Sequence, residues 1–135
     1  MVPVCSRTLL QGAVTIEPSA LETLPLLHQS ARPDAWREWF DVAGVTDVNA
    51  MGGSRYELFS MLVEAAKAGL GVALVPRFFV LGEIASGELI CPCSHTLRSL
   101  RSYYLVYPEN KAGSAALLFF RQWLSAQATA YRECA

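Results

Sequence analysis

The sequence predicts an α/β fold in which a mostly parallel sheet is flanked by helices. Short apolar runs alternate with helical patterns along the chain, and this order is typical of βαβ units. Residues 71–75 have the composition of a fully buried strand, whereas residues 32–44 repeat large apolar side chains with the period of a helix. The length of 135 residues suits a domain with its own core.

Short elements are expected before residue 32. Residues 2–5 and 25–28 are short apolar runs with the composition of strands. Residues 18–24 begin with a proline and are expected to form a short helix. Ser6 can cap a helical turn that follows the first strand.

Residues 32–44 give the clearest helical pattern in the chain. Pro33 marks the start of the expected helix and Gly44 marks its end. Its large apolar side chains recur at positions i, i+3, i+4 and i+7, where they form one amphipathic stripe: Trp36, Trp39, Phe40 and Ala43. We interpret the tryptophans of this stripe as packing anchors.

The central part of the chain is expected to hold a short strand and a long helix. Residues 48–51 are predicted to be the strand, which Gly52 and Gly53 then break. Ser54 and Glu57 have the spacing of a capping box, in which the serine accepts from early backbone N–H groups and the glutamate reaches back. The helix expected after Ser54 is apolar on most faces, which indicates burial between the sheet and a neighbour.

The last third of the chain is expected to contain two helices and two strands. Residues 77–86 are predicted to form a helix that Gly87 stops, and residues 88–90 a brief strand. Residues 102–107 are rich in aromatic and β-branched side chains and predict a strong strand. Residues 114–131 predict one amphipathic helix.

Composition and charge narrow the class of protein. Eleven basic and twelve acidic residues give a formal net charge of -1, and no basic patch predicts nucleic-acid binding by this segment. No apolar run reaches the roughly 20 residues of a membrane span, and no signal peptide is visible, so we expect a cytoplasmic protein. A hydrophobic content of 53% indicates surface that is buried against a partner, and we expect a homo-oligomer.

The residues that usually carry catalysis or hold cofactors form no recognised motif here. The sequence has no P-loop, no complete GxGxxG and no GxSxG elbow, so we expect neither an enzyme nor a cofactor. The two histidines and the four cysteines do not have the spacing of a zinc site. We interpret the cysteines, Cys134 included, as ordinary thiols.

Several segments stand in an order that is known from one family: residues 32–36, 53–57, 65–76, 102–108 and 118–124. They resemble the corresponding segments of the LysR-type transcription regulators. Residues 65–76 (AAKAGLGVALVP) are similar to the helix, Gly-x-Gly turn, buried strand and proline of the effector domain of that family. Residues 32–36 and 53–57 resemble the branch of the glycine-cleavage activator and the β-lactamase regulator. Residues 102–108 are similar to the strand that returns to the first subdomain, and residues 118–124 (LFFRQWL) look like its closing helix.

The resemblance implies an effector-binding domain of the type-II periplasmic-binding-protein-like fold, which has two Rossmann-like subdomains. Residues 1–100 would be the second subdomain, and residues 101–135 would be the return strand and C-terminal helix of the first. The family also implies that a small-molecule effector is the ligand. DNA binding would need the helix-turn-helix domain, which this chain does not contain.

Gly53, Ser54 and Arg55 are the first candidate ligand-binding residues. Ligands of open α/β sheets bind outside the carboxyl ends of the strands, and these residues follow a predicted strand. They also begin a predicted helix, whose N-terminal amides favour anions. The alternative is that Ser54 acts only as an N-cap.

His28, Ser30 and Tyr104 are the other candidates. His28 and Ser30 lie at the end of a predicted strand, where they can reach the lip of a cleft or belong to a solvated loop. Adjacent side chains of a strand face opposite ways, so only one of Tyr103 and Tyr104 can easily face a cleft. We favour Tyr104, because the return strand contributes to the cleft in the β-lactamase-regulator branch.

Three functions remain open at this point. The first is the sensing part of a LysR-type regulator, in which an effector shifts the orientation of the subdomains. The second is a fragment of a periplasmic-type solute-binding protein for an amino-acid-like or carboxylate ligand. The third is a remnant that folds or dimerises but senses nothing.

Overall fold

The computed structural model describes residues 1–98 and 102–133. The chain divides into two compact units, Met1–Leu100 and Arg101–Ala135. The division falls where the sequence predicts the boundary between the two subdomains. The assignment of these units to the second and first subdomains stays a prediction.

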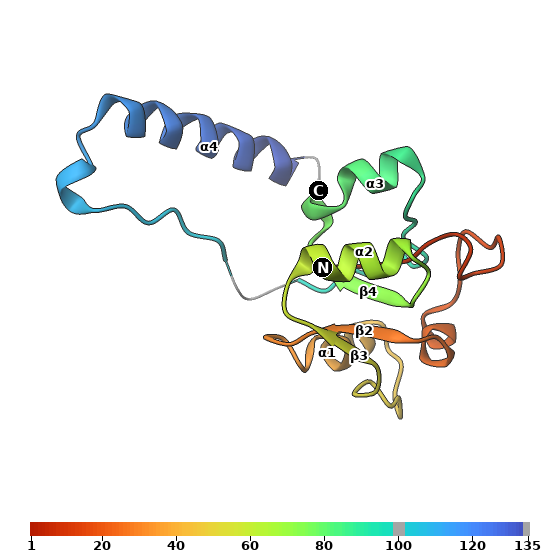
Figure 1. Ribbon diagram of the computed structural model, residues 1–135. Coiled ribbons are helices and arrows are strands. Elements are labelled where there is room, and N and C mark those ends of the chain that lie inside the picture. The colour runs from red at the N-terminus through yellow and green to blue at the C-terminus, as the bar shows by residue number, and fades with distance from the viewer. Residues whose placement is uncertain (99–101, 134–135) are drawn as a thin grey trace. The chain divides into compact units, whose positions relative to one another are not determined.

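The first unit is built on a four-stranded sheet with the strand order β1-β4-β2-β3 (Figure 1). Its strands are β1 (Val2–Val4), β2 (Leu26–Gln29), β3 (Ser54–Tyr56) and β4 (Val72–Val75). β2 pairs in parallel with both β3 and β4, and β1 pairs antiparallel with β4. The expected mostly parallel sheet is therefore confirmed.

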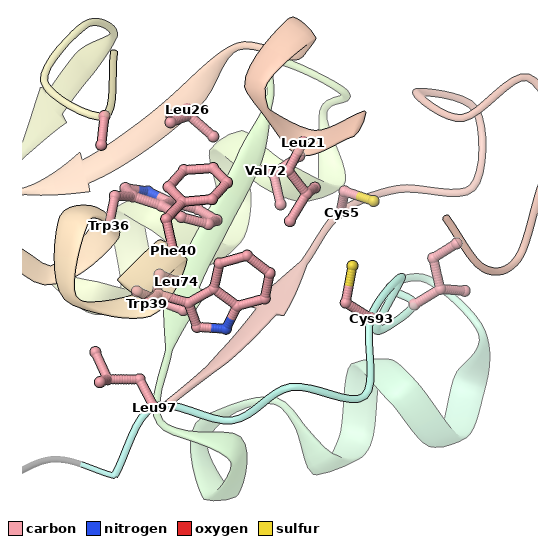
Figure 2. Close-up of a cluster of buried hydrophobic side chains, with 12 residues drawn as sticks. Cys5, Leu21, Leu26, Trp36, Trp39, Phe40, Val72, Leu74, Cys93 and Leu97 are labelled. Carbon is pink, nitrogen blue, oxygen red and sulfur yellow. The ribbon is translucent and has the colours of Figure 1, made fainter. Parts of the chain in front are cut away.

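Helix α1 (Ala35–Val42) covers one face of this sheet. Its three large aromatic side chains, Trp36, Trp39 and Phe40, are buried against Leu26 of β2 and against Val72 and Leu74 of β4 (Figure 2). The indole Nε1 of Trp36 donates to the carbonyl oxygen of Leu27 at 3.0 Å, which ties the helix to β2. The apolar stripe expected from the sequence is the stripe that packs on the sheet.

Helix α2 (Phe59–Lys67) covers the opposite face. Leu62, Val63 and Ala66 of α2 pack with strand residues that alternate with those facing α1, namely Leu27, Ala73 and Val75. The alternation follows from the period of two along a strand. Because both faces are covered, β4 is buried along its whole length, as its composition predicts.

The shorter elements of the first unit follow the expected order with smaller extents. They are η1 (Pro18–Thr23), η2 (Arg77–Phe79) and α3 (Leu81–Ser86), the last ended by Gly87 at a φ of 78°. The single helix expected at residues 77–86 is therefore divided at Val80. The strand expected at residues 88–90 is reduced to an isolated bridge between Ile90 and Cys5.

Two predictions for the central segment are wrong. Residues 48–51 form no strand; the N–H of Ala50 instead donates to the carbonyl oxygen of Val48 at 2.9 Å in a tight turn. Ser54 does not begin the helix, because Ser54–Tyr56 pairs with β2 and α2 starts only at Phe59. Pairing with a distant strand has overridden the local capping pattern.

The second unit consists of an extended segment, the short helix η3 (Glu109–Lys111) and the long helix α4 (Ala115–Glu133). The predicted helix at residues 114–131 is confirmed. The predicted strand at residues 102–107 is wrong for this structure, because within the described residues the segment pairs with no other strand. No helix among the described residues is long and apolar enough to cross a membrane.

Candidate functional site

The parallel strands give the sheet two chemically different ends. The register pairs Gln29 with Tyr56 and Leu27 with both Ser54 and Ala73. We call the end at Gln29 and Tyr56 the carboxyl end, and the end at Leu26 and Gly53 the amino end. Ligands of open α/β sheets bind outside carboxyl ends, so the location of each candidate residue decides its interpretation.

Gly53, Ser54 and Arg55 lie toward the amino end of the sheet, because Ser54 is the first residue of β3. Gly53 has a φ of 122°, and a Cβ atom there would lie 2.0 Å from the carbonyl oxygen of Leu26. The guanidinium of Arg55 donates back to the carbonyl oxygen of Met51 at 3.2 Å. The helix-terminus rationale for these three residues no longer applies, and their ligand role stays a prediction.

His28 holds the turn before β3 in place. Its ring is 2% exposed, and Nε2 lies 2.8 Å from the carbonyl oxygen of Gly52. A carbonyl oxygen can only accept, so Nε2 carries the proton in the neutral ring. Nδ1 is then a buried acceptor that has no hydrogen-bond partner among the described residues. This geometry fits an anchor of the turn, and a ligand role for His28 stays a prediction.

Ser30 and the adjacent Gln29 lie at the carboxyl end. The N–H of Ser30 donates to the carbonyl oxygen of Tyr56 at 2.8 Å, and Gln29 Nε2 donates to that of Glu57 at 2.9 Å. Gln29 Oε1 is buried and has no hydrogen-bond partner in the described part of the chain. An unsatisfied buried amide oxygen is costly, which makes it a ready acceptor for a ligand N–H or a water.

The first turn of α2 lies at the same end of the sheet. Leu58 precedes the helix and no side chain caps it, while the first helical bond runs from the N–H of Leu62 to the carbonyl oxygen of Leu58 at 3.2 Å. The N–H groups of Phe59, Ser60 and Met61 therefore have no acceptor within the helix. Such a terminus attracts anions.

Arg32 adds positive charge beside this terminus. Its guanidinium carbon lies 5.7 Å from the centre of the Phe59 ring, in a cation–π contact. Phe59 also contacts Phe79 of η2, with ring centres 5.8 Å apart. No sequence pattern points to Gln29, Arg32 or Phe59 as site residues. The signal that identifies them is the register of β3, which only the pairing with β2 reveals.

Tyr104 belongs to the second unit, where its side chain is 82% exposed. Its neighbour Tyr103 is also exposed. Because the extended segment joins no sheet within the described residues, the expectation that one tyrosine faces a cleft and the other a core is not tested. The ligand role of Tyr104 stays a prediction.

The described cysteines are free thiols in apolar surroundings. Burial raises the pKa of the Cys5 thiol to about 12, with a smaller contribution from Cys91. Burial raises the pKa of Cys93 to about 11 and also raises that of Cys91. No group of side chains suited to a metal ion occurs in residues 1–98 and 102–133, and Cys134 lies outside them.

The chain is similar over nearly its whole length to known transcription regulators. It is 34% identical over 134 residues to the glycine cleavage system transcriptional activator of Escherichia coli strain K12, which covers 98% of this chain and 44% of that protein. It is 34% identical over 127 residues to the transcriptional activator AmpR of Rhodobacter capsulatus, and this match covers 94% of this chain and 42% of AmpR. The chain thus spans less than half the length of these curated relatives.

Solved effector domains share the fold. The effector domain of AmpR from Pseudomonas aeruginosa superposes with a TM-score of 0.77 at 27% identity, over 96% of this chain and 60% of that one. The AmpR effector-binding domain from Citrobacter freundii gives a TM-score of 0.79 at 25% identity, over 93% of this chain and 61% of that one. These likenesses confirm the periplasmic-binding-protein-like α/β fold. A family model described as the LysR substrate binding domain matches residues 1–129, and the chain belongs to this family.

Proposed function

We propose that this chain is the larger part of the effector-binding region of a LysR-type DNA-binding transcription regulator, and that it senses a small molecule without transforming it. The relatives that support this proposal are named as transcription regulators. Contact with DNA is assigned to a part of the regulator outside this chain. Cytoplasmic location and homo-oligomerisation belong to the same proposal.

The effector site is assigned to the carboxyl end of the sheet, around Gln29, Ser30 and the first turn of α2. The observation that carries this assignment is the buried, unpartnered Gln29 Oε1 beside an uncapped helix terminus. An anion suits the N–H groups of α2 and the charge of Arg32, whereas an N–H donor suits Gln29 Oε1. The ligand class that supplies both is an amino acid or a short peptide with a free carboxylate.

Ligand-induced thermal stabilisation tests the proposal, because a ligand that binds only the folded state raises the melting temperature. Amino acids, small carboxylates and peptidoglycan fragments are screened against the full 135-residue chain. We expect a selective shift with members of one ligand class. The absence of any shift would leave a folded remnant as the better description.

Matched variants at the two ends of the sheet locate the site. Gln29→Met removes the amide and keeps the length of the side chain, and Ser30→Ala removes one hydroxyl. Ser54→Ala removes the same hydroxyl at the amino end. We expect the first two variants to weaken the shift and Ser54→Ala to leave it unchanged. The opposite pattern would move the site to Gly53, Ser54 and Arg55.

A further inference from the structure

Among the residues that the structure describes, the outer flank of β1 is paired only at its two ends. Cys5 and Ile90 exchange backbone bonds of 3.1 and 2.9 Å, and the N–H of Leu97 donates to the carbonyl oxygen of Met1 at 2.9 Å. Between them Pro3 has no N–H to donate. Pro3 therefore cannot donate a ladder bond to the segment from Ile90 to Leu97.

A difference in length between β1 and the segment that faces it opens a cavity. The five residues from Met1 to Cys5 face the eight residues from Ile90 to Leu97, so the longer segment bulges away from β1. A cavity of about 240 Å³ lies there, lined by Val2, Thr15, Arg77, Cys91, Cys93, Ser94 and Thr96. It shares none of these residues with the effector site proposed at Gln29, Ser30 and Phe59.

The lining of this cavity combines apolar side chains with hydroxyl groups and carries one charge, that of Arg77. Within the described residues no hydrogen bond or ion pair occupies the guanidinium, although its charge partly offsets the rise that burial causes in the pKa of Cys91. Thr15, Ser94 and Thr96 contribute three hydroxyl donors. The charge of the Glu17 carboxylate raises the pKa of the Cys93 thiol, so negative charge lies near the Cys93 side of the cavity. The Arg77 side is therefore the side suited to an anion.

Arg77 also connects the cavity to the effector end of the sheet. Arg77 and Phe79 belong to the same turn, η2, and the Phe79 ring contacts Phe59 in the first turn of α2. A group that holds Arg77 in one position would restrict η2, and through Phe79 it would restrict the start of α2.

We propose that the cavity beside β1 is a second binding site, for a small oxyanion such as phosphate or a carboxylate. Arg77 pairs with the charge, and the hydroxyls of Thr15, Ser94 and Thr96 donate to its oxygens. The half-buried Cys91 thiol is a reporter in the same cavity. The proposal goes beyond the effector site and does not depend on it.

Alkylation of Cys91 in the full chain tests this site. The thiolate displaces iodide from iodoacetate or iodoacetamide, so a carbon–sulfur bond forms, the carbon–iodine bond breaks, and the thiol proton goes to solvent. Peptide mapping by mass spectrometry assigns the alkylated cysteine. Because Arg77 attracts the anionic reagent, we expect Arg77→Ala to lower the ratio of the iodoacetate rate to the iodoacetamide rate by roughly fivefold, as for a loss of one exposed ion pair.

Two variants and one competitor complete the experiment. Arg77→Lys keeps the charge and is expected to keep most of the ratio, and Arg98→Ala removes an exposed arginine outside the cavity and is expected to leave the ratio unchanged. Inorganic phosphate at constant ionic strength is expected to protect Cys91 in the unmodified chain and not in Arg77→Ala. A ratio that Arg77→Ala does not change, or equal protection in both proteins, would overturn the proposal.

Discussion

The two ends of the same sheet use their polar groups differently. At the amino end Gly53 lies against the carbonyl oxygen of Leu26, and His28 binds the carbonyl oxygen of Gly52. His28 Nδ1 and, at the carboxyl end, Gln29 Oε1 are both buried without a hydrogen-bond partner within the described residues. The difference is that the carboxyl end also carries the start of α2, which no side chain caps. His28 and Gly53 therefore hold the turn before β3 in place, whereas the carboxyl end is the one at which we propose that the ligand binds.

Gly53→Ala is expected to have the largest effect. The added methyl group would lie 2.0 Å from the carbonyl oxygen of Leu26, at a backbone φ of 122° that L-residues rarely adopt. We expect a loss of about 3 kcal/mol or more in the free energy of unfolding, measured by urea denaturation. Gly52→Ala is the control, because nothing lies within 4 Å of its added Cβ. Equal stability of the two variants would contradict this assignment.

His28→Ala is expected to destabilise the fold by about 2 kcal/mol, because it removes a buried ring and its bond to Gly52. The matched control is His95→Ala, whose ring is exposed and whose loss is expected to cost less than about 1 kcal/mol. Thermal denaturation of both variants measures the difference. Similar costs for the two histidines would show that His28 is no anchor of the turn before β3.

Arg32→Ala is expected to weaken binding of an anionic effector with a smaller effect on stability. The lost cation near the first turn of α2 should reduce affinity several-fold, by about 1 kcal/mol. Arg37→Ala serves as the control, since Arg37 is exposed and pairs with Asp34 at 2.9 Å on α1. Calorimetric titration measures both affinities, and an equal loss in the two variants would argue against a local role for Arg32.

Arg55→Ala is expected to have the smallest effect of the four. Arg55 is exposed, and among the described residues its side chain bonds only to the nearby carbonyl oxygen of Met51, at 3.2 Å. The free energy of unfolding should stay within about 0.5 kcal/mol, and ligand affinity should be unchanged. A marked fall in affinity with unchanged stability would return the ligand to the amino end.

Much of the fold could be predicted from local patterns. The aromatic stripe of α1, the buried strand β4 and the helix α4 are set by side-chain periodicity within each segment. Ser54 is ambiguous, because the same residue fits a capping box with Glu57 and the start of a strand. The pairing of Ser54–Tyr56 with β2 decides between these structures, and that pairing is not visible locally.

The candidate site could also be predicted only where local patterns determine the structure. Ser30 could be selected because it follows a strand that the sequence predicts correctly. Gly53 and Ser54 are candidates because they follow a strand predicted at residues 48–51. That strand does not form, and Ser54 instead begins β3, so the two residues lie at the amino end of the sheet and not at the carboxyl end. In the second unit, residues 102–107 have the composition of a strand, but a strand also needs a neighbour to accept its backbone bonds.

Backbone amide chemical shifts, recorded while the full chain is titrated with the effector found by thermal screening, test the central claim most directly. We predict that the largest changes occur at Gln29, Ser30, Phe59 and Ser60. The amides of Gly53, Ser54 and Arg55 should change little. Largest changes at these three residues, with Gln29 and Phe59 unaffected, would contradict the account.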